Sequence, residues 1–555
     1  MTPHRAEPAV SAAAAPLLRD GAALFRTNPF EERWLGIQKR LLGSAYQECG
    51  RVLALVGQLA PLPNLARVVD ILRPVHAQIR ARLKARAPAT PEELDAYVEI
   101  GLLLLSHGFE VELQEIADTG VTPTDLLARF KANHGAMFVL PGVPLDVPPA
   151  RVVLEVCYQA RRALHILHTT LRGVSIEAGR LRARVYNAFF PGGDLLRFLR
   201  GGQARRTGVH TLILGDTGTG KELVARALAY GRPIPYIEAD KAFAGRATGG
   251  FHVVNTSGLA VNLVDSLLFG HRKGAFTGAD RDAPGVLAKC VAGEILFLDE
   301  LGDLAPEVQV KLLRVVEDGK YTPVGATEER ALGGALVFAA QPALFRSRRF
   351  RRDLRHRLNE HVIRLPSLRA RLDSDPAELP FLVRLFATAA AGPAYAEHLA
   401  TEVLRLCEGE LRRYPWAGNV RELKGCVSNM HEQREYEPPS GYEPPPSGEV
   451  GVAAGAGVVS GMGGPVAAVG TAGAGAPGAE LARGVLEGAI SAAELRHQYV
   501  VHMYGLTGSY TEAARRLQID WRTVRSVVEA EKGRLGEVVP GGRARRPGVG
   551  VGSCG

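Results

Sequence analysis

The chain has 555 residues, several times the length of one folding unit, so a single-domain protein is excluded and roughly two to four domains are expected. A hydrophobic fraction of 46% and a charged fraction of 23% are those of a globular protein, whereas 63 glycines and 35 prolines predict that part of the chain is unpacked. The net charge of +9 favours contact with polyanions but does not by itself establish it.

The cysteines and the apolar runs bear on the compartment. The six cysteines are scattered without a CxxC pair, so neither a zinc site nor a disulfide framework is predicted, and a reducing compartment fits. The longest strongly apolar run, IGLLLL from Ile100, is too short to span a bilayer, and the apolar part of the N-terminus is short and weak for a signal peptide. We therefore expect a cytoplasmic protein with no membrane partner.

Apolar residues recur at helical spacing from about Pro29 to Arg200, which predicts a helical N-terminal domain. No strand alternation competes there, and no chemical constellation stands out. His165 and His168 lack an acidic or cysteine partner at metal-ligand spacing, so we expect both on a helix surface. The pattern leaves the signal or partner of this domain open.

The pattern changes at His210, where the run HTLILG leads into a glycine-rich turn and then a helix. Three further apolar runs have the length of strands, at residues 251–255, 294–300 and 334–341. Helical stretches separate these runs, as a parallel sheet requires. The centre of the chain is therefore expected to be an α/β domain, and helices dominate again from Pro380 to about Arg434.

The segment GDTGTGKE matches the phosphate-binding GxxxxGK loop and lies between a predicted strand and a predicted helix, where such a loop must lie. Its glycines let backbone N–H groups point at phosphate oxygens, and Lys221 reaches the β and γ phosphates. Glu222 stands where Ser or Thr usually follows the lysine, so Mg²⁺ must be held without that hydroxyl. The expected nucleotide-binding residues are Gly215, Asp216, Thr217, Gly218, Thr219, Gly220, Lys221 and Glu222.

A second part of an ATP site is predicted at EILFLDE, residues 294–300. Its four apolar residues form a buried strand that ends in Asp299 and Glu300. Asp299 is expected to bind Mg²⁺ through water, and Glu300 to polarise the attacking water. An apolar strand ending in two carboxylates is common, so the prediction depends on the phosphate loop that precedes it.

The segment RFRRDLRHRLNEH, residues 349–361, is dense in arginine. One interpretation is a nucleic-acid patch. The other, which we favour, is that Arg351 and Arg357 reach the γ-phosphate bound by a neighbouring subunit, because the segment follows the fourth predicted strand of an ATPase core. A guanidinium supplied in trans stabilises the charge of phosphoryl transfer.

Five motifs in order make residues 181–435 resemble the AAA+ ATPases that activate transcription by sigma-54 RNA polymerase, the bacterial enhancer-binding proteins. The motifs are GDTGTGKELVARAL (Walker A), LFGHRKGAFTGA (signature loop), EILFLDELGDL (Walker B), FRRDLRHRLN (arginine fingers) and YPWAGNVRELKG (sensor II). The resemblance implies a multidomain protein with a central α/β AAA+ P-loop ATPase and a helical lid.

The resemblance also implies roles for single residues. Asn255 would hold the catalytic glutamate until the partner is engaged, and Arg421 would report the nucleotide state. Phe276 and Thr277 would stand at the tip of a loop that touches sigma-54, where the partner buries the aromatic ring. The alternative for this loop is an ordinary hairpin with an inward-pointing phenylalanine. The whole loop comprises Gly274, Ala275, Phe276, Thr277, Gly278 and Ala279.

Two segments depart from the family pattern or have no role in it. At sensor I the family usually has a Thr-Asn pair, whereas this chain has Ala340 and Gln341. Gln341 is a candidate to bind the attacking water or the γ-phosphate, but its reach differs. The segment PYIEADKAFAGRATGG, residues 235–250, looks longer than the family needs, and the sequence assigns it no role.

The C-terminal part resembles the DNA-binding module of the same family. TEAARRLQI and the helix after Asp520 have helix-turn-helix spacing, although a small helical packing module is the alternative. The residues expected to face DNA are Trp521, Arg522, Thr523 and Arg525. The expected domains are a helical N-terminal regulatory domain of unknown type (1–175), an α/β core (181–370), a lid (371–435), a Pro/Gly/Ala-rich linker (436–490), a helix-turn-helix (491–535) and a basic Gly-rich tail (536–555).

These features lead to a hypothesis: a DNA-binding activator that forms a ring, expected to be a hexamer, and uses ATP and Mg²⁺ to remodel the sigma-54 RNA polymerase holoenzyme. Double-stranded DNA, the holoenzyme and further copies of the chain are its expected partners. Two alternatives remain. The core could be a nucleotide-responsive scaffold without hydrolysis, or an AAA+ remodeller of another client.

Overall fold

The computed structural model describes residues 15–47, 63–202, 210–244, 250–256, 260–347, 349–412 and 414–438, together with Val500, Tyr504, Ser509, Tyr510, Ala514 and 524–528. The chain separates into two compact units, Met1–Glu449 and Val450–Gly555. Each unit is described by itself.

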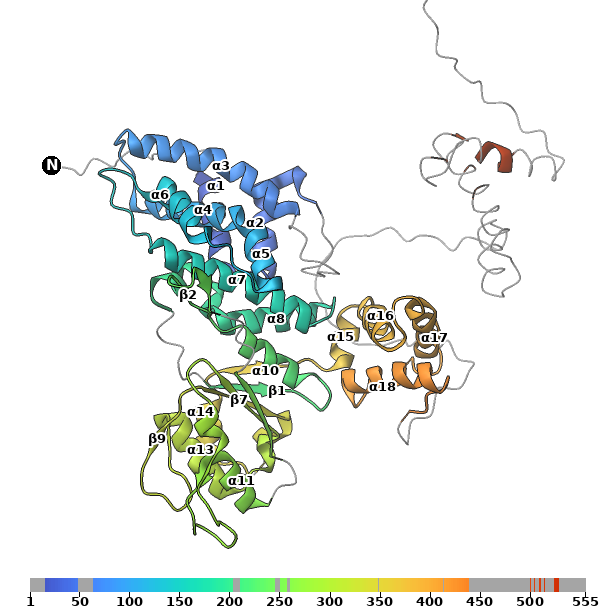
Figure 1. The fold of residues 1–555 in the computed structure, drawn as a ribbon. Helices are drawn as coiled ribbons and strands as arrows, with labels where there is room; N and C mark the ends of the chain where they lie inside the picture. Colours follow the sequence, from blue (N-terminus) through green and yellow to red (C-terminus); the bar gives the residue numbers. More distant parts are fainter. Residues whose placement is uncertain are drawn as a thin grey trace, which may run out of the picture. The chain divides into compact units, whose positions relative to one another are not determined.

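Helices form the N-terminal part of the first unit, as predicted (Figure 1). They are α1 (Ala15–Phe25), α2 (Glu32–Leu42), α3 (Pro63–Lys84), α4 (Pro91–Gly108), α5 (Glu110–Thr119), α6 (Leu126–Phe138), α7 (Ala150–Thr170) and α8 (Ile176–Phe189). Helix α4 shows why such segments start where they do. The Thr90 side chain accepts from the N–H of Glu93, whose carboxylate accepts from the N–H of Thr90, and Pro91 fits the first turn.

Close packing holds these helices together. A Cβ atom at Gly21 of α1 would lie 2.7 Å from the Leu72 side chain and 3.3 Å from that of Ile100, so the glycine lets α1 approach α3 and α4. The Tyr97 ring is fully buried, and its hydroxyl donates to the Met137 carbonyl at 2.6 Å. The buried residues of these helices belong to one apolar cluster that continues into the central part of the chain, where it includes Ile213 and Val224.

The central sheet has five parallel strands in the order β11-β1-β10-β7-β4. They are β1 (Thr211–Leu214), β4 (Phe251–Asn255), β7 (Ile295–Asp299), β10 (Ala335–Ala340) and β11 (Val362–Arg364). The sequence predicted the first four. It missed β11, because three residues after an arginine-rich helix carry too little pattern to indicate a strand.

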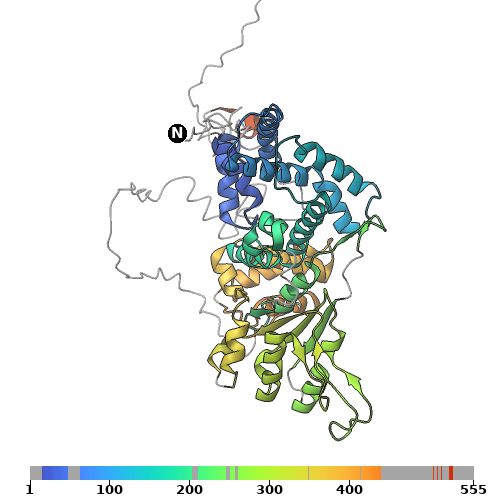
Figure 2. The same cartoon turned by 90° about the vertical axis from the view of Figure 1, so that its left-hand side faces the viewer.

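Helices cover both faces of this sheet (Figure 2). Ile213 packs on the face covered by α8 and α10 (Lys221–Tyr230). Its neighbours Leu212 and Leu214 pack on the opposite face. The helices of that face are α11 (Val261–Phe269), α12 (Val286–Lys289), α13 (Pro306–Asp318) and α14 (Arg352–Leu358). Alternation along the strand thus produces a three-layer α/β domain.

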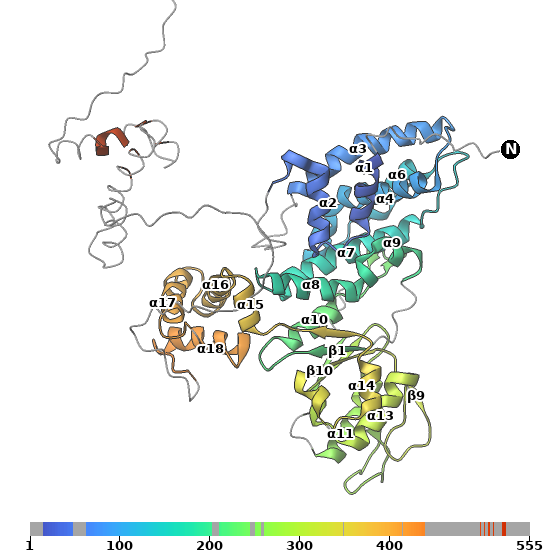
Figure 3. The same ribbon diagram turned by 180° about the vertical axis from the view of Figure 1, so that it is seen from behind.

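A helical lid follows the sheet (Figure 3). Its helices are α15 (Leu368–Ser374), α16 (Glu378–Ala391), α17 (Ala396–Glu408) and α18 (Asn419–Glu432). They enclose a separate apolar cluster that includes Leu382, Val403 and Leu423. The lid therefore has its own core beside the sheet domain.

Among the described residues, three short antiparallel strand pairs flank the central sheet. They are β2 (Tyr236–Ile237) with β3 (Ala242–Phe243), β5 (Gly270–His271) with β6 (Ala283–Pro284), and β8 (Lys320–Tyr321) with β9 (Arg330–Ala331). The second hairpin carries the GAFTGA loop. The first hairpin lies in the segment to which the sequence assigned no role.

The second unit is described at few positions. Val500, Ala514, Val524 and Val528 form a small buried cluster. Residues 524–528 are helical, and Arg525 is exposed. Most of the expected helix-turn-helix, including Trp521, Arg522 and Thr523, lies outside the described residues, as do the expected linker beyond residue 438 and the tail.

Candidate nucleotide site and the contacts around it

The GDTGTGKE loop joins β1 to α10 at the carboxyl edge of the sheet. Gly218 and Gly220 have φ values of 77° and 97°, a region that favours glycine. The backbone N–H groups of Gly218, Gly220 and Lys221 bond to no acceptor among the described residues. The Lys221 ammonium donates to the carbonyls of Gly215 at 3.0 Å and Asp216 at 3.3 Å. Free N–H donors and a movable ammonium fit a polyphosphate.

Glu222 turns away from this loop. Its carboxylate pairs with Arg226 one turn along α10, at 2.7 Å, and half of its side chain is exposed. Thr219 also lies in the loop; it is buried, and its hydroxyl donates to the Asp216 carbonyl at 2.7 Å. Neither Glu222 nor Thr219 thus offers a free oxygen for Mg²⁺, as the Ser or Thr that usually follows the lysine does.

Strand register brings the predicted acidic residues together with Asn255. The β4 strand pairs with β7 so that Asn255 lies opposite Asp299. Glu300 follows with φ 58° and ψ 45°, a left-handed conformation that turns the chain sharply at the sheet edge. Its N–H donates to Asp299 Oδ1 at 3.0 Å, which leaves the other carboxylate oxygen available. An available carboxylate oxygen beside the phosphate loop is a ligand that Mg²⁺ prefers.

Burial raises the pKa of Asp299, while the hydrogen bond from the Glu300 N–H and the charge of Lys221 oppose that rise. The negative charges of Glu300 and Glu222 add to the rise in the pKa of Asp299. The site therefore concentrates negative charge that a cation would stabilise.

Gln341 follows β10 on the same edge. Its Nε2 lies 3.5 Å from Thr217 Oγ1, so the longer side chain at this position reaches the phosphate loop. The Gly215 N–H donates to the Ala340 carbonyl at 3.2 Å, which ties the start of the loop to the end of β10. The structure thus brings Gln341 to the predicted nucleotide-binding residues.

The start of α18 is docked on the phosphate loop. The Arg421 N–H donates to the Gly218 carbonyl at 3.2 Å. Asn419 Nδ2 donates to the Thr217 carbonyl at 2.9 Å, and its Oδ1 accepts from the Leu368 N–H at 2.8 Å. A Cβ at Gly218 would lie 2.0 Å from the Gly418 carbonyl, so only glycine permits this approach. The sequence predicted Arg421 here but missed Asn419, which is 3% exposed and has φ 55°.

The two predicted arginine fingers are paired within their own segment. Arg351 forms a bidentate ion pair with Asp353, at 2.7 and 3.1 Å. Arg357 pairs with Glu360 at 2.5 Å. Both arginine side chains are 41% exposed, so part of each side chain is accessible from outside the subunit.

The GAFTGA loop is a tight turn on the surface of the β5–β6 hairpin. The Gly274 N–H donates to the Ala279 carbonyl at 2.8 Å, and Gly274 and Gly278 have φ values of 79° and 95°. The Phe276 ring is half-buried and lies edge-on to the His271 ring, at a centroid distance of 4.9 Å. Thr277 is exposed. The phenylalanine is thus neither a core residue nor free in solvent.

Helix α7 joins the N-terminal helices to the end of the P-loop helix. The Arg162 guanidinium donates to the carbonyls of Tyr230 at 2.7 Å and Arg232 at 2.9 Å, and the Gln159 amide donates to the Gly231 carbonyl. These bonds satisfy carbonyls at the C-terminus of α10, where a positive charge also favours the helix dipole. Nothing in the sequence pattern indicated this contact.

The β2–β3 hairpin also packs on α7. The Phe243 ring stacks on Tyr158 with centroids 3.8 Å apart, and the Tyr236 N–H donates to Glu155 at 3.0 Å. The hairpin carboxylate Glu238 lies within ion-pair distance of Arg151, at 3.9 Å. The segment without an assigned role is therefore a docking element for the N-terminal helices.

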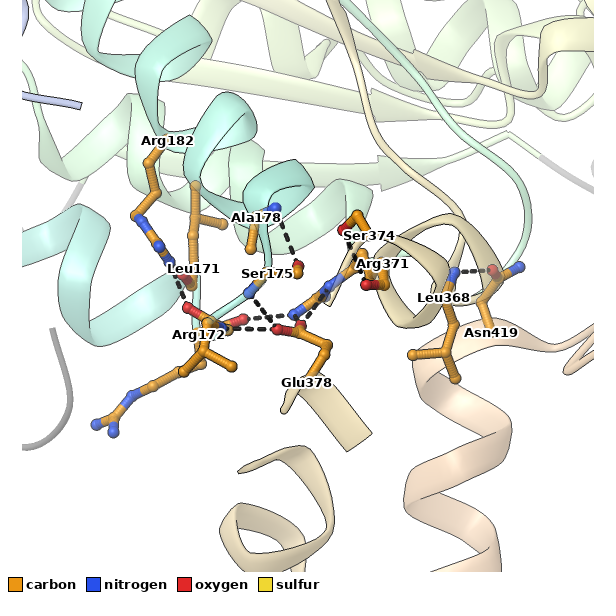
Figure 4. Close-up of polar contacts among 12 residues, drawn as sticks. Leu171, Arg172, Ser175, Ala178, Arg182, Leu368, Arg371, Ser374, Glu378 and Asn419 are labelled. Carbon is orange, nitrogen blue, oxygen red and sulfur yellow. Dashed lines mark hydrogen bonds and ion pairs between the residues drawn. The ribbon is translucent and has the colours of Figure 1, made fainter. Parts of the chain in front are cut away.

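A buried ion pair connects the lid to the loop between α7 and α8 (Figure 4). Glu378 is fully buried and pairs with Arg371. Its other oxygen accepts from the backbone N–H groups of Val174 at 2.7 Å and Ser175 at 2.6 Å. Arg371 also donates to the Arg172 carbonyl at 2.7 Å. We found no sequence signal for this cluster.

The two histidines expected on a helix surface, His165 and His168, differ in burial. His165 is partly exposed and contacts Gln114 and Asp118, in line with a helix-surface position. His168 is only 7% exposed and is one of the buried residues of α7, so the surface prediction is wrong for this residue. Burial lowers the pKa of His168 to about 4.

Among the described residues no group of three or more histidine, cysteine and acidic side chains could hold a metal ion, and no helix has both the length and the hydrophobicity of a membrane span.

Fold and site together define the central domain as a P-loop ATPase domain of the AAA+ class: a parallel sheet with the phosphate loop after β1, two carboxylates after β7 and a helical lid on the loop. The family model described as "Sigma-54 interaction domain" matches residues 198–364. These residues therefore form a domain similar to the sigma-54 interaction domain of AAA+ transcriptional activators.

Curated relatives agree with this assignment. The Nif-specific regulatory protein of Klebsiella pneumoniae is 38% identical over 232 residues, which are 40% of this chain and 40% of that protein. The DNA-binding transcriptional regulator NtrC of Rhizobium meliloti (strain 1021) is 38% identical over 230 residues, 40% of this chain and 43% of that protein. The chain therefore matches less than half the length of these relatives.

Solved structures give a weaker likeness. The crystal structure of NtrX from Brucella abortus in complex with ATP covers 70% of this chain and 77% of its own, with 19% identity and a TM-score of 0.35. A TM-score of this size is too low to establish a shared arrangement of the whole chains.

Proposed function

We propose that the protein hydrolyses ATP in a ring of identical subunits and uses the energy to remodel the sigma-54 RNA polymerase holoenzyme at promoters. The observation that supports this proposal is the register of β4 and β7, which pairs Asn255 with Asp299 in a segment matched by the sigma-54 interaction domain. A set of residues for hydrolysis and a loop for the partner thus lie in one domain.

Each residue has a role in this proposal. The free N–H groups of the loop and Lys221 bind the phosphates of ATP. Glu300 accepts a proton from the attacking water, and Asn255 restrains Glu300 until the partner is engaged. Gln341 and Arg421 lie against the loop and respond to the γ-phosphate. Asp299 would hold Mg²⁺, which supplies charge neutralisation at the phosphate oxygens.

The ring supplies the remaining charge. Arg351 and Arg357 lie on and beside α14, are partly exposed, and reach the nucleotide of the neighbouring subunit in the assembled ring. A guanidinium delivered in trans stabilises the transition state and makes hydrolysis depend on assembly.

The GAFTGA loop contacts sigma-54. Phe276 already leaves part of its ring accessible, and Thr277 is exposed between two glycines of positive φ. Movement of this loop away from His271 would free the ring for burial in the partner, which is worth about 1.5–3 kcal/mol for a side chain of this size.

The flanking regions supply regulation and DNA binding. The N-terminal helices contact the P-loop helix through Arg162 and the lid through the loop at Val174, so a ligand or partner on these helices can alter the ATPase core. The helix that carries Arg525 belongs to a helix-turn-helix that binds double-stranded DNA in this proposal.

The first test measures ATPase activity against protein concentration, for the wild type and for Glu300→Gln. We expect activity per subunit to rise as the ring assembles. Glu300→Gln should lower kcat by about a hundredfold or more while nucleotide binding persists. A monomeric preparation with constant activity per subunit would contradict the shared site, and equal turnover in Glu300→Gln would contradict the assigned base.

The second test asks for the partner. Purified sigma-54 is mixed with the protein and an ADP–metal fluoride complex, and capture is compared for the wild type and Thr277→Ala. We expect Thr277→Ala to lose capture while its ATPase activity is unchanged, because Thr277 lies far along the chain from the phosphate loop on a separate hairpin. Equal capture by both proteins would favour a remodeller of another client.

A further inference from the structure

Thr256 is a buried hydroxyl at the end of β4 that no motif singles out. It is 3% exposed and follows Asn255 directly. Its Oγ1 lies 3.0 Å from the carbonyl oxygen of Asp299 and 3.1 Å from that of Glu300. One hydroxyl proton is thus shared between the carbonyls of the two residues that end the neighbouring strand.

These carbonyls belong to a strained piece of backbone. Glu300 has φ 58° and ψ 45°, a region that residues with a side chain avoid unless the surroundings hold them there. The Glu300 N–H is held by Asp299 Oδ1, and the two carbonyls are held by Thr256. Since the backbone conformation at Glu300 sets the direction of its Cα–Cβ bond, the Thr256 hydroxyl controls where the carboxylate points.

We propose that Thr256 is a positioning residue for hydrolysis: its hydroxyl holds the left-handed turn at Glu300 and so aims the carboxylate at the attacking water. This inference rests on the proposed ATPase function. It also links Asn255, the last residue of β4, to Thr256, because a shift at Asn255 is carried by the backbone to Thr256 and from there to the carbonyls of Asp299 and Glu300.

A hydroxyl with only a structural role would not affect the chemical step selectively. In the described part of the chain, the hydrogen bonds of the Thr256 hydroxyl go to Asp299 and Glu300 and not to the phosphate loop, so its loss leaves the N–H donors and Lys221 in place. The effect therefore falls on the chemical step and not on the binding of ATP, and any residue that keeps the hydroxyl restores it.

The test compares Thr256→Val, which keeps the shape and removes the hydroxyl, with Thr256→Ser, which keeps the hydroxyl. Thr401→Val is the matched control, because it removes a hydroxyl that donates to the Glu397 carbonyl on an exposed face of the lid. In Thr256→Val we expect kcat to fall by about tenfold with KM for ATP changed by less than about twofold. Thr256→Ser and Thr401→Val should keep the wild-type kcat.

The outcomes separate the inference from the proposed function. Wild-type kcat in Thr256→Val, or a loss in Thr256→Ser equal to that in Thr256→Val, would overturn the inference and leave the ATPase proposal standing. A wild-type protein without hydrolysis would overturn both. If Thr256→Val does not fold, Thr256→Cys keeps the volume with a weaker donor, and a wild-type kcat in that variant would also overturn the inference.

Discussion

The carboxyl edge of the sheet and the contact between α7 and the ATPase core teach different things about this chain. At the edge, short motifs dictate a local backbone shape: Gly218 and Gly220 permit the phosphate loop, and an apolar strand delivers Asp299. At the α7 contact, Arg162 caps carbonyls that lie about seventy positions along the chain, at separations of 68 and 70 residues. Sites formed by residues that are neighbours in sequence can be predicted from the sequence. Contacts between residues far apart in the sequence cannot.

The two regions also differ in how their polar groups are satisfied. The edge leaves donors and one carboxylate oxygen free for a ligand, whereas the interface satisfies its charged groups within the protein. We therefore expect mutations at the interface to cost stability and mutations at the edge to cost function. Four predictions test this contrast, in order of decreasing effect.

The largest effect is expected for Glu378→Ala. This change leaves the Arg371 guanidinium buried without its partner and removes the acceptor of two backbone N–H groups. Breaking a buried pair in this way costs about 3–5 kcal/mol. The measurement is the free energy of unfolding in urea. Glu397→Ala, which removes an exposed partner of Arg384, is the control and should cost less than about 1 kcal/mol. Similar losses in the two variants would show that the Glu378 pair is no stronger than a surface pair.

Acid should destabilise the protein through His168. Its pKa is lowered from 6.5 to about 4, so between these pH values the unfolded chain binds a proton that the folded chain does not. The free energy of unfolding therefore falls as the pH falls through this window, by about 3 kcal/mol for a shift of this size. His168→Leu should flatten the pH dependence of the urea midpoint, whereas His165→Leu should not. An unchanged slope in His168→Leu would refute the prediction.

Arg162→Met should cost about 2 kcal/mol, because it keeps the aliphatic stem and removes charged hydrogen bonds to the Tyr230 and Arg232 carbonyls. Hydrogen exchange at the C-terminal turn of α10 should increase with it. Arg180→Met, which removes an exposed pair with Glu177, is the control. Equal exchange in both variants would mean that α7 does not support the P-loop helix.

Asn419→Ala should weaken nucleotide binding by about tenfold, or about 1.4 kcal/mol. The change removes bonds to the Thr217 carbonyl and the Leu368 N–H, so the lid loses its direct hold on the phosphate loop. Titration with a fluorescent ATP analogue measures the effect, and Asn429→Ala on the same helix is the control. Unchanged affinity in Asn419→Ala would place the lid's contribution elsewhere.

Much of the central domain followed from the sequence. The parallel sheet and four of its strands were predicted because each strand depends on a local pattern. The position of Asn255 near the catalytic glutamate was expected only from the family resemblance, and the structure pairs Asn255 with Asp299. Thr256 was missed although its neighbour was predicted. The two carbonyls that accept from its hydroxyl lie 43 and 44 residues away in the sequence. Their direction depends on a backbone conformation that the sequence does not indicate.

Other misses have the same origin. Asn419 stands within a motif that was recognised, but its contacts to Thr217 and Leu368 arise only when the lid folds back on the core. The roles assigned to Arg351, Arg357 and Phe276, and the DNA contacts of the C-terminal helices, stay predictions. They concern partners, and a single chain carries only one side of each contact.

The cis pairing of the arginine fingers has a consequence for assembly. Within the subunit Arg351 pairs with Asp353 and Arg357 with Glu360. In the proposed ring, these arginines would exchange one anionic partner for another, so subunits without nucleotide would gain little from meeting at this surface. A bound triphosphate, which carries more negative charge than a single carboxylate, would favour the exchange. ATP would then stabilise the association of the subunits as well as supply the energy.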